Sequence, residues 1–311
     1  MTAITPTYPE STPMSPHSPT NENRPTRRDL LQAAAATAAT AVAGSGLSSA
    51  EAAAPAGAGA SSGRIHQSVC RWCYGKISLD DLCSAARRMG LVGIDLLGPT
   101  DFPTIKKYGL ICTMVSSHPL SNGLCDPKYW DASLKAMNAA VEATAREGWR
   151  NVICFSGNRR GIDDKTGMDN CVKALREIVP VAEKANVILN MELLNSKVDH
   201  KDYMCDHSPW GVELVKRVGS DHFKLLYDIY HMQIMEGDVI RTIKNDHAYF
   251  GHYHTGGNPG RHELDETQEL NYKAITRAIA DVGFEGFFAH EFIPTRDPLT
   301  SLAEAVALCV V

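Results

Sequence analysis

The sequence predicts one closed (β/α)8 barrel over residues 63–311, and three observations favour this fold class. From Ile65 onward, eight short apolar runs alternate with helix-like segments, a pattern typical of strand–helix units around a parallel sheet. These units occupy roughly 250 residues, the usual size of such a barrel. No Gly-rich dinucleotide fingerprint follows the first run, which argues against an open, doubly wound sheet.

Apolar runs, amphipathic spacing and capping residues indicate where each strand and helix lies. Strands are expected at residues 65–70, 92–97, 110–116, 151–156, 187–193, 223–229, 248–254 and 286–292. Helices are expected at residues 78–89, 101–108, 127–147, 168–185, 209–218, 237–245, 271–282 and 300–309. Ser78 suits the N-cap of the first helix, and Gly90 suits the position just after its end.

Residues 1–62 are expected to form a separate leader. Residues 1–25 are rich in Pro, Ser, Thr and Asn and are expected to be disordered. Arg27 and Arg28 then precede an Ala-rich run and Ala-x-Ala sites, which resembles a bacterial twin-arginine export signal. We therefore expect a periplasmic or otherwise exported protein, cleaved within residues 51–63. If the leader is a disordered tract or a surface helix instead, the protein is expected to be cytoplasmic.

Composition narrows the class of partner. The 311 residues are 44% hydrophobic, enough for one large domain with its own core. The net charge is −5, and no dense run of Lys or Arg follows the leader, so nucleic acid is not an expected partner. The apolar part of the leader is too short for a membrane span of about 20 residues. We expect a small-molecule substrate and no membrane contact after cleavage.

The nine cysteines do not form a recognisable metal or redox site. Cys70 and Cys73 have the spacing of a redox motif, but they follow the first expected strand rather than a thioredoxin-like context. Some cysteines would be able to pair after export, although the odd count leaves at least one free. Most are predicted to be small buried hydrophobic residues.

Four of the apolar runs end in residues that bind divalent metals. These residues are Glu192, Asp228, His254 and Glu291, separated by 36, 26 and 37 residues, roughly one strand–helix unit each. The C-terminal ends of barrel strands meet at one mouth, so the four side chains are expected to surround one site. Three carboxylates and one imidazole favour Mg²⁺ or Mn²⁺, with Co²⁺ or Zn²⁺ as alternatives.

Glu192 and Glu291, from the fifth and eighth strands, suit proton transfer beside a carbonyl group. A metal ion polarises the carbonyl and stabilises an enediolate, while one carboxylate removes the α-proton and the other returns it at the neighbouring carbon. The sequence therefore predicts these two glutamates as the acid–base pair.

Three segments resemble the hydroxypyruvate isomerase family, which lies among the xylose isomerase-like TIM barrels together with ketose 3-epimerases. They are residues 191–195 (MELLN), 227–233 (YDIYHMQ) and 252–263 (HYHTGGNPGRHE), and the similarity covers roughly residues 65–297. The resemblance implies the glutamate pair and metal ligands named above. It further implies that His231 and Arg261 contact substrate oxygens, Arg261 as a bidentate partner of a carboxylate or diol.

Two further residues are candidates for substrate contact because of their positions after strands. His118 follows the third strand, and Trp72 follows the first and would stack on a sugar. Their alternatives are a structural histidine and an aromatic cap of the barrel. The loops at residues 158–167 and 196–208 are long enough to form walls or a lid, with His200 and Tyr203 near the entrance.

Three functional hypotheses follow. The first is a metal-dependent isomerase that converts hydroxypyruvate to tartronate semialdehyde. The second is a periplasmic isomerase or epimerase of a ketose or 3-keto sugar. This one is favoured by the leader and by His254, because the epimerase branch has His where hydroxypyruvate isomerases tend to have Gln. The third is a sugar-binding barrel without turnover. The resemblance also suggests a homo-oligomer.

Overall fold

The computed structural model describes residues 63–311. The predicted leader, with Arg27, Arg28 and the cleavage region up to residue 62, lies outside the described residues. Within the described part of the chain, no helix is long and apolar enough to cross a membrane.

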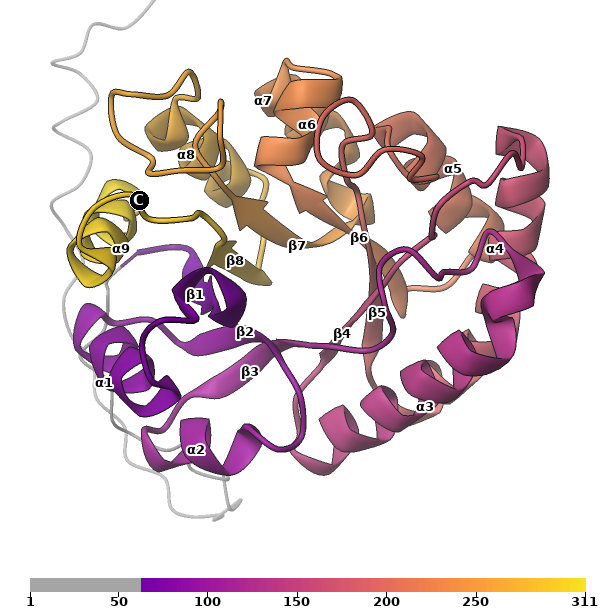
Figure 1. Cartoon of the computed structure of the whole chain (residues 1–311), viewed down its shortest axis with the longest axis horizontal. Coiled ribbons are helices and arrows are strands. Elements are labelled where there is room, and N and C mark those ends of the chain that lie inside the picture. Colours follow the sequence, from indigo (N-terminus) through magenta and orange to yellow (C-terminus); the bar gives the residue numbers. More distant parts are fainter. Residues whose placement is uncertain (1–62) are drawn as a thin grey trace, which may run out of the picture. The chain divides into compact units, whose positions relative to one another are not determined.

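Eight parallel strands close into a barrel in the order of the sequence, which confirms the predicted fold class. Closure is made by β1 and β8, which pair from His66 opposite Phe287 to Val69 opposite His290. Figure 1 shows the helices around the outside of the sheet. The strands are β1 (His66–Cys70), β2 (Gly93–Leu97), β3 (Ile111–Val115), β4 (Asn151–Cys154), β5 (Ile188–Glu192), β6 (Phe223–Asp228), β7 (Phe250–Thr255) and β8 (Phe287–His290).

The outer helices begin and end where the sequence places capping residues. Ser78 accepts a hydrogen bond from the backbone N–H of Asp81, and Gly90 ends the same helix with a φ of 81° that suits glycine. The helices are α1 (Leu79–Met89), α2 (Phe102–Lys107), α3 (Trp130–Arg146), α4 (Asp164–Ala185), α5 (Ser208–Val218), α6 (Ile229–Met235), α7 (Val239–Asp246), α8 (Tyr272–Asp281) and α9 (Pro298–Leu308). Short 3₁₀ turns cover Arg71–Tyr74, Pro127–Tyr129 and His247–Tyr249.

One helix, α6, was not predicted. It starts at Ile229, directly after the last residue of β6, whereas the sequence pattern placed one helix at residues 237–245. Gly237, with a φ of 67°, separates α6 from α7. No Gly, Pro or Asn separates the strand from the helix, so the sequence gives no turn signal at the boundary. This helix matters for the site, because its N-cap residue, Asp228, is a candidate metal ligand.

The apolar core has two parts. The larger part lies between the sheet and the surrounding helices. A separate buried cluster is formed by Met114, Ile153 and Leu226, against which Leu96 and Phe155 pack. Because side chains alternate along a strand, Leu226 shares the inner face of β6 with Asp228 two residues later. This small cluster therefore fills the barrel interior beneath the mouth.

All nine cysteines are free in this structure, and eight of them are buried. Cys73 is the partly exposed one. The barrel is thus held together by packing and by the closed sheet, as the sequence predicts.

Candidate metal and acid–base site

The four predicted metal ligands meet at the C-terminal mouth of the barrel. One donor atom from each of Glu192, Asp228, His254 and Glu291 lies within 4.8 Å of the other three. The Nδ1 atom of His254 lies 3.2 Å from Glu192 Oε1, 2.6 Å from Glu291 Oε2 and 3.9 Å from Asp228 Oδ2. All four side chains are buried. The order of the strands therefore brings together residues up to 99 positions apart.

Helix α6 orients Asp228 and His231. The Oδ1 atom of Asp228 accepts a hydrogen bond from the backbone N–H of His231 at 3.0 Å, so Asp228 is the N-cap of this helix. Its second oxygen, Oδ2, faces His254 Nδ1 at 3.9 Å and Arg261 Nη2 at 2.5 Å. Because His231 lies in the first turn of α6, the same capping interaction fixes its position beside the site.

Asp95, on β2, holds His254 from the opposite side and was missed from the sequence. Its Oδ2 atom lies 3.3 Å from His254 Nε2 and 2.7 Å from His252 Nε2. Its other oxygen accepts hydrogen bonds from Ser68, at 2.7 Å, and from Thr113. A carboxylate behind an imidazole selects the tautomer that leaves the other nitrogen free for a metal. The signal that would have found Asp95 is a lone carboxylate in the apolar strand Gly93–Leu97.

The two glutamates differ in protonation. Burial raises the pKa of Glu192 to about 7, and the neighbouring carboxylates of Glu291 and Asp228 add to this effect against the opposing contact with His254. Burial also acts to raise the pKa of Glu291, but the charges of Arg261 and His254 outweigh it and hold that pKa well below its ordinary value. Two carboxyl groups with separated pKa values are suited to acid and base roles.

Three of the four predicted substrate contacts surround this pair. The Nη2 atom of Arg261 donates to Asp228 Oδ2 at 2.5 Å and to Glu291 Oε2. His231 Nε2 lies 3.1 Å from Arg261 Nη1. The indole N–H of Trp72 donates to Glu291 Oε1 at 2.5 Å. Arg261 and Trp72 thus both contact one of the two glutamates, and His231 reaches it through Arg261.

The prediction that His118 contacts the substrate is corrected by the structure. Its Nδ1 atom lies 3.1 Å from the carbonyl oxygen of Asn122, and its Nε2 atom accepts a hydrogen bond from the backbone N–H of Phe155 at 3.2 Å. Both ring nitrogens are therefore used to fix loops, and His118 does not line the cavity at the mouth. Tyr203 is also structural, because its buried hydroxyl donates to the carbonyl oxygen of Glu192 at 3.0 Å.

A cavity of about 440 Å³ opens beside the ligands. The loop after β5 contributes Asp199 and His200 to its wall, as predicted for residues 196–208. The loop after β4 supports that wall from behind, with Arg159 donating from its backbone to Asp202 at 2.6 Å. The full lining is Trp72, Leu96, Leu120, Ile153, Phe155, Glu192, Leu194, Asp199, His200, Tyr230, His231, Gly260, Arg261, Glu291 and Ile293.

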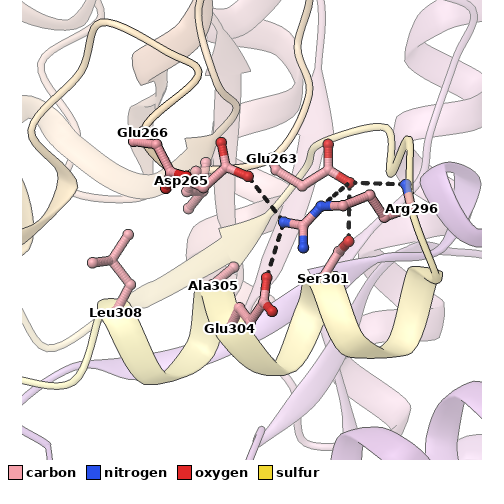
Figure 2. Close-up of a pocket in the computed structure, with 9 residues that line it drawn as sticks. Glu263, Asp265, Glu266, Arg296, Ser301, Glu304, Ala305 and Leu308 are labelled. Atoms are coloured by element: carbon pink, nitrogen blue, oxygen red, sulfur yellow. Dashed lines mark hydrogen bonds and ion pairs between the residues drawn. The ribbon is translucent and has the colours of Figure 1, made fainter.

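A second cavity, of about 490 Å³, lies beside α9 and contains none of the four ligands. Figure 2 shows that its polar side chains, apart from Glu266, are linked to one another by hydrogen bonds and ion pairs. Arg296 donates to Asp265 and Glu304, each at 2.9 Å, and Glu263 accepts from Ser301 at 2.9 Å. These contacts tie the loop after β7 to the loop after β8 and to α9, which is a structural role.

The donor set at the mouth fits a divalent cation. Three carboxylates and one imidazole are the ligands that Mg²⁺ and Mn²⁺ accept, and the four donor atoms are already gathered. Mutual repulsion among the buried carboxylates contributes to the raised pKa of Glu192. A cation of charge two held between them would relieve this repulsion.

Comparison with known proteins agrees with the fold. Residues 104–309 match the family model described as xylose isomerase-like TIM barrel. A putative hydroxypyruvate isomerase of Danio rerio is 32% identical over 127 residues, which cover 40% of this chain and 46% of that protein. A D-psicose 3-epimerase of Ruminiclostridium cellulolyticum is 32% identical over 125 residues, covering 40% and 41%. The chain thus spans less than half the length of these two relatives.

A solved structure supports the architecture alone. An AP endonuclease of family 2 from Brucella melitensis superimposes with a TM-score of 0.68 at 23% identity, covering 78% of this chain and 97% of that one. At this identity the likeness concerns only the course of the backbone.

Proposed function

Because this chain belongs to the xylose isomerase-like TIM-barrel family, we propose that it is a metal-dependent isomerase or epimerase of an α-hydroxy carbonyl compound. The observation that carries the proposal is the pair Glu192 and Glu291. Both glutamates contact His254 Nδ1 in one buried cluster, and their pKa values are displaced in opposite directions.

The reaction removes the proton α to a carbonyl and passes through an enediolate of the substrate. An isomerase returns the proton at the neighbouring carbon while the hydroxyl proton moves to the carbonyl oxygen, and an epimerase returns it to the opposite face of the same carbon. Glu192, Asp228, His254 and Glu291 would hold a divalent cation, Mg²⁺ or Mn²⁺ in the first instance, which when bound supplies polarisation of the substrate carbonyl. Glu291 is kept ionised by Arg261 and takes the α-proton. Glu192 is the proton donor, to the neighbouring carbon in an isomerase or to the opposite face of the same carbon in an epimerase.

The surrounding side chains orient the substrate and the base. Trp72 and Arg261 each donate to a different oxygen of Glu291, which fixes the plane of that carboxylate. Burial and the charge of Arg261 lower the pKa of His231 well below its ordinary value, so this imidazole is neutral. A neutral imidazole and a guanidinium side by side suit a hydroxyl and an anionic oxygen of the substrate.

The first candidate substrate is hydroxypyruvate, converted to tartronate semialdehyde. It is supported by the family resemblance of the segments that carry the ligands and by the relative in Danio rerio, a protein named putative hydroxypyruvate isomerase. The carboxylate of this substrate would be placed against Arg261.

The second candidate is a ketose or 3-keto sugar, isomerised or epimerised. A cavity of about 440 Å³ favours it, because cavities of roughly 300 to 1,000 Å³ enclose ligands larger than a three-carbon acid. The relative in Ruminiclostridium cellulolyticum, a D-psicose 3-epimerase, supports it as well. We further propose, from Arg27 and Arg28 in the leader, that such a sugar would be met after export.

Product analysis separates these proposals. The full chain is incubated with Mn²⁺ or Mg²⁺ and with hydroxypyruvate or a panel of ketoses, and the products are resolved by chromatography before and after removal of the metal by chelation. Conversion that depends on the metal supports the isomerase, and its substrate decides between the two candidates. Tight sugar binding without conversion would instead indicate a binding barrel.

A further inference from the structure

The cavity at the mouth is divided into a charged half and an apolar half. The charged half holds Glu192, His231, Arg261 and Glu291 beside the proposed metal position. The apolar half is lined by Leu96, Leu120, Ile153 and Phe155, which lie on or just after β2, β3 and β4, whereas the charged residues come from β5 to β8 and the segments after them. A free sugar carries hydroxyl groups along its whole length, and only the first half offers them partners.

The polar groups behind the apolar half are already hydrogen-bonded to the protein. His118 uses both ring nitrogens on backbone groups, including the N–H of Phe155. The hydroxyl of Ser117 donates to the carbonyl oxygen of Ile153. A substrate hydroxyl placed against this wall would give up water without gaining a partner, which is unfavourable.

The backbone of β2 is distorted where it meets this half. Leu96 has a φ of 61°, in the region that favours glycine, and the pairing of β2 with β3 shifts register on both sides of Asp95. The distortion brings an apolar side chain to the cavity next to the carboxylate that holds His254. A leucine kept in a strained conformation at a functional site indicates a specific use.

Apolar side chains are also exposed around the rim of the mouth. Within residues 63–311, five large apolar side chains are strongly exposed, and three of them belong to the mouth. Trp72 and Ile293, 49% and 40% exposed, line the cavity itself. Val198, 60% exposed, precedes the wall residues Asp199 and His200. Water would be displaced from these side chains by an apolar ligand.

We infer that the substrate is a keto sugar that carries an apolar substituent, such as the aryl or alkyl aglycone of a glycoside, on the side away from the reacting carbons. This inference rests on the proposed function, since it assumes that the hydroxy-carbonyl group faces Glu192 and Glu291. The substituent lies over Leu96, Ile153 and Phe155.

The test compares two ligand pairs on the full chain loaded with Mn²⁺. Turnover is measured with the methyl and phenyl glycosides of 3-keto-glucose. Binding is measured by calorimetry with methyl and phenyl β-D-glucoside, which cannot react. We expect the phenyl compound of each pair to be preferred by about tenfold, because burying an aromatic ring is favourable.

Leu96→Asn is the informative variant. Asn has nearly the size of Leu and tolerates a positive φ, so the fold is expected to persist, while the wall becomes polar. The phenyl preference should fall towards one. Ile293→Ser should weaken the preference in part. Its matched control, Val310→Ser, alters a side chain of similar exposure away from the cavity and should have no effect.

The outcomes distinguish this inference from the proposed function. If both keto glycosides turn over equally and Leu96→Asn changes nothing, the inference is wrong and the isomerase stands. If neither compound reacts but the phenyl preference in binding is lost in Leu96→Asn, the apolar subsite stands and the isomerase is wrong. If Ile293→Ser instead changes the oligomeric state in light scattering and leaves the preference intact, the rim is a subunit interface and the inference fails.

Discussion

Asp95 Oδ2 lies 3.3 Å from His254 Nε2, on the side of the imidazole opposite the nitrogen that faces Glu192 and Glu291. The two residues come from β2 and β7 and are both completely buried. The contact leaves the two nitrogens of His254 in different surroundings, Nε2 against Asp95 and Nδ1 facing the proposed metal position.

Replacing Asp95 should therefore weaken the binding of metal. In Asp95→Asn, we expect the affinity for Mn²⁺ to fall about 10- to 100-fold, because the imidazole loses the partner that fixes its tautomer. Electron paramagnetic resonance of free Mn²⁺ measures the affinity without any assay of activity. Ser68→Ala removes a neighbour of Asp95 but keeps the carboxylate and should bind Mn²⁺ nearly normally. Equal affinity of Asp95→Asn and the native chain would contradict the role of this contact.

Trp72 is expected to support catalysis through one hydrogen bond. Trp72→Phe keeps an aromatic ring but removes the N–H that donates to Glu291. A hydrogen bond to a charged group contributes about 1.5–3 kcal/mol, so kcat should fall about tenfold or more with a smaller change in KM. Trp210→Phe is the control, because that indole donates at 3.4 Å to a backbone oxygen of Asp164 far from the ligands. Similar losses in both variants would speak against a specific role.

His118 and His231 should respond in opposite ways to the same substitution. His118→Gln is expected to lower the melting temperature and leave kcat/KM of the folded fraction unchanged, because this ring bonds only to loop backbone. His231→Gln should preserve stability more closely and lower kcat/KM, since His231 lines the cavity beside Arg261. Thermal melts and steady-state kinetics on both variants check this. A loss of kcat/KM in folded His118→Gln would restore it as a substrate contact.

Glu263 should make stability depend on acid pH. Burial acts to raise its pKa, but hydrogen bonds from Thr295 and Ser301 outweigh burial and lower the pKa to about 2. A carboxyl group with a depressed pKa stabilises the fold above the pKa of the unfolded chain, near 4.5. This stabilisation is lost as the pH falls from about 4.5 towards 2.

Glu263→Gln should therefore cost about 1–3 kcal/mol at pH 7 and flatten the acid side of the stability profile. Denaturant unfolding at a series of pH values measures both effects. Glu304, which contacts the same Arg296 but is exposed, provides the control, and Glu304→Gln should change stability by less than about 1 kcal/mol. Figure 2 shows the two glutamates on either side of Arg296. An unchanged acid profile in Glu263→Gln would refute the assignment.

The sequence predicted the barrel and the gathering of the four candidate ligands for a physical reason. Strands of a parallel barrel are buried on both faces and appear as short apolar runs, so all eight fall within about two residues of their expected bounds. Ligands at the ends of such runs share one mouth because the strands are parallel, which made Glu192, Asp228, His254 and Glu291 predictable as a group.

The features that were not predicted depend on where side chains point and what they contact across the barrel, which their positions in the sequence do not reveal. Asp95 lies inside β2, where its function follows from the residues across the barrel and not from its neighbours in sequence. His118 follows a strand as a ligand would, but its ring turns into the loops. Helix α6 begins at the end of β6 without a turn residue between them. The export signal stays a prediction, because it lies before residue 63.

The two-glutamate mechanism is tested most directly by proton NMR of the metal-loaded protein in D2O, with hydroxypyruvate and keto sugars as substrates. We predict that deuterium enters the carbon next to the carbonyl in the native chain. It should be absent, or slower by at least about a hundredfold, in both Glu192→Gln and Glu291→Gln, since each general acid or base contributes about 10²–10⁴-fold. Glu285→Gln, an exposed surface change, should exchange normally. Exchange that persists in either of the two site variants would contradict the two-glutamate mechanism.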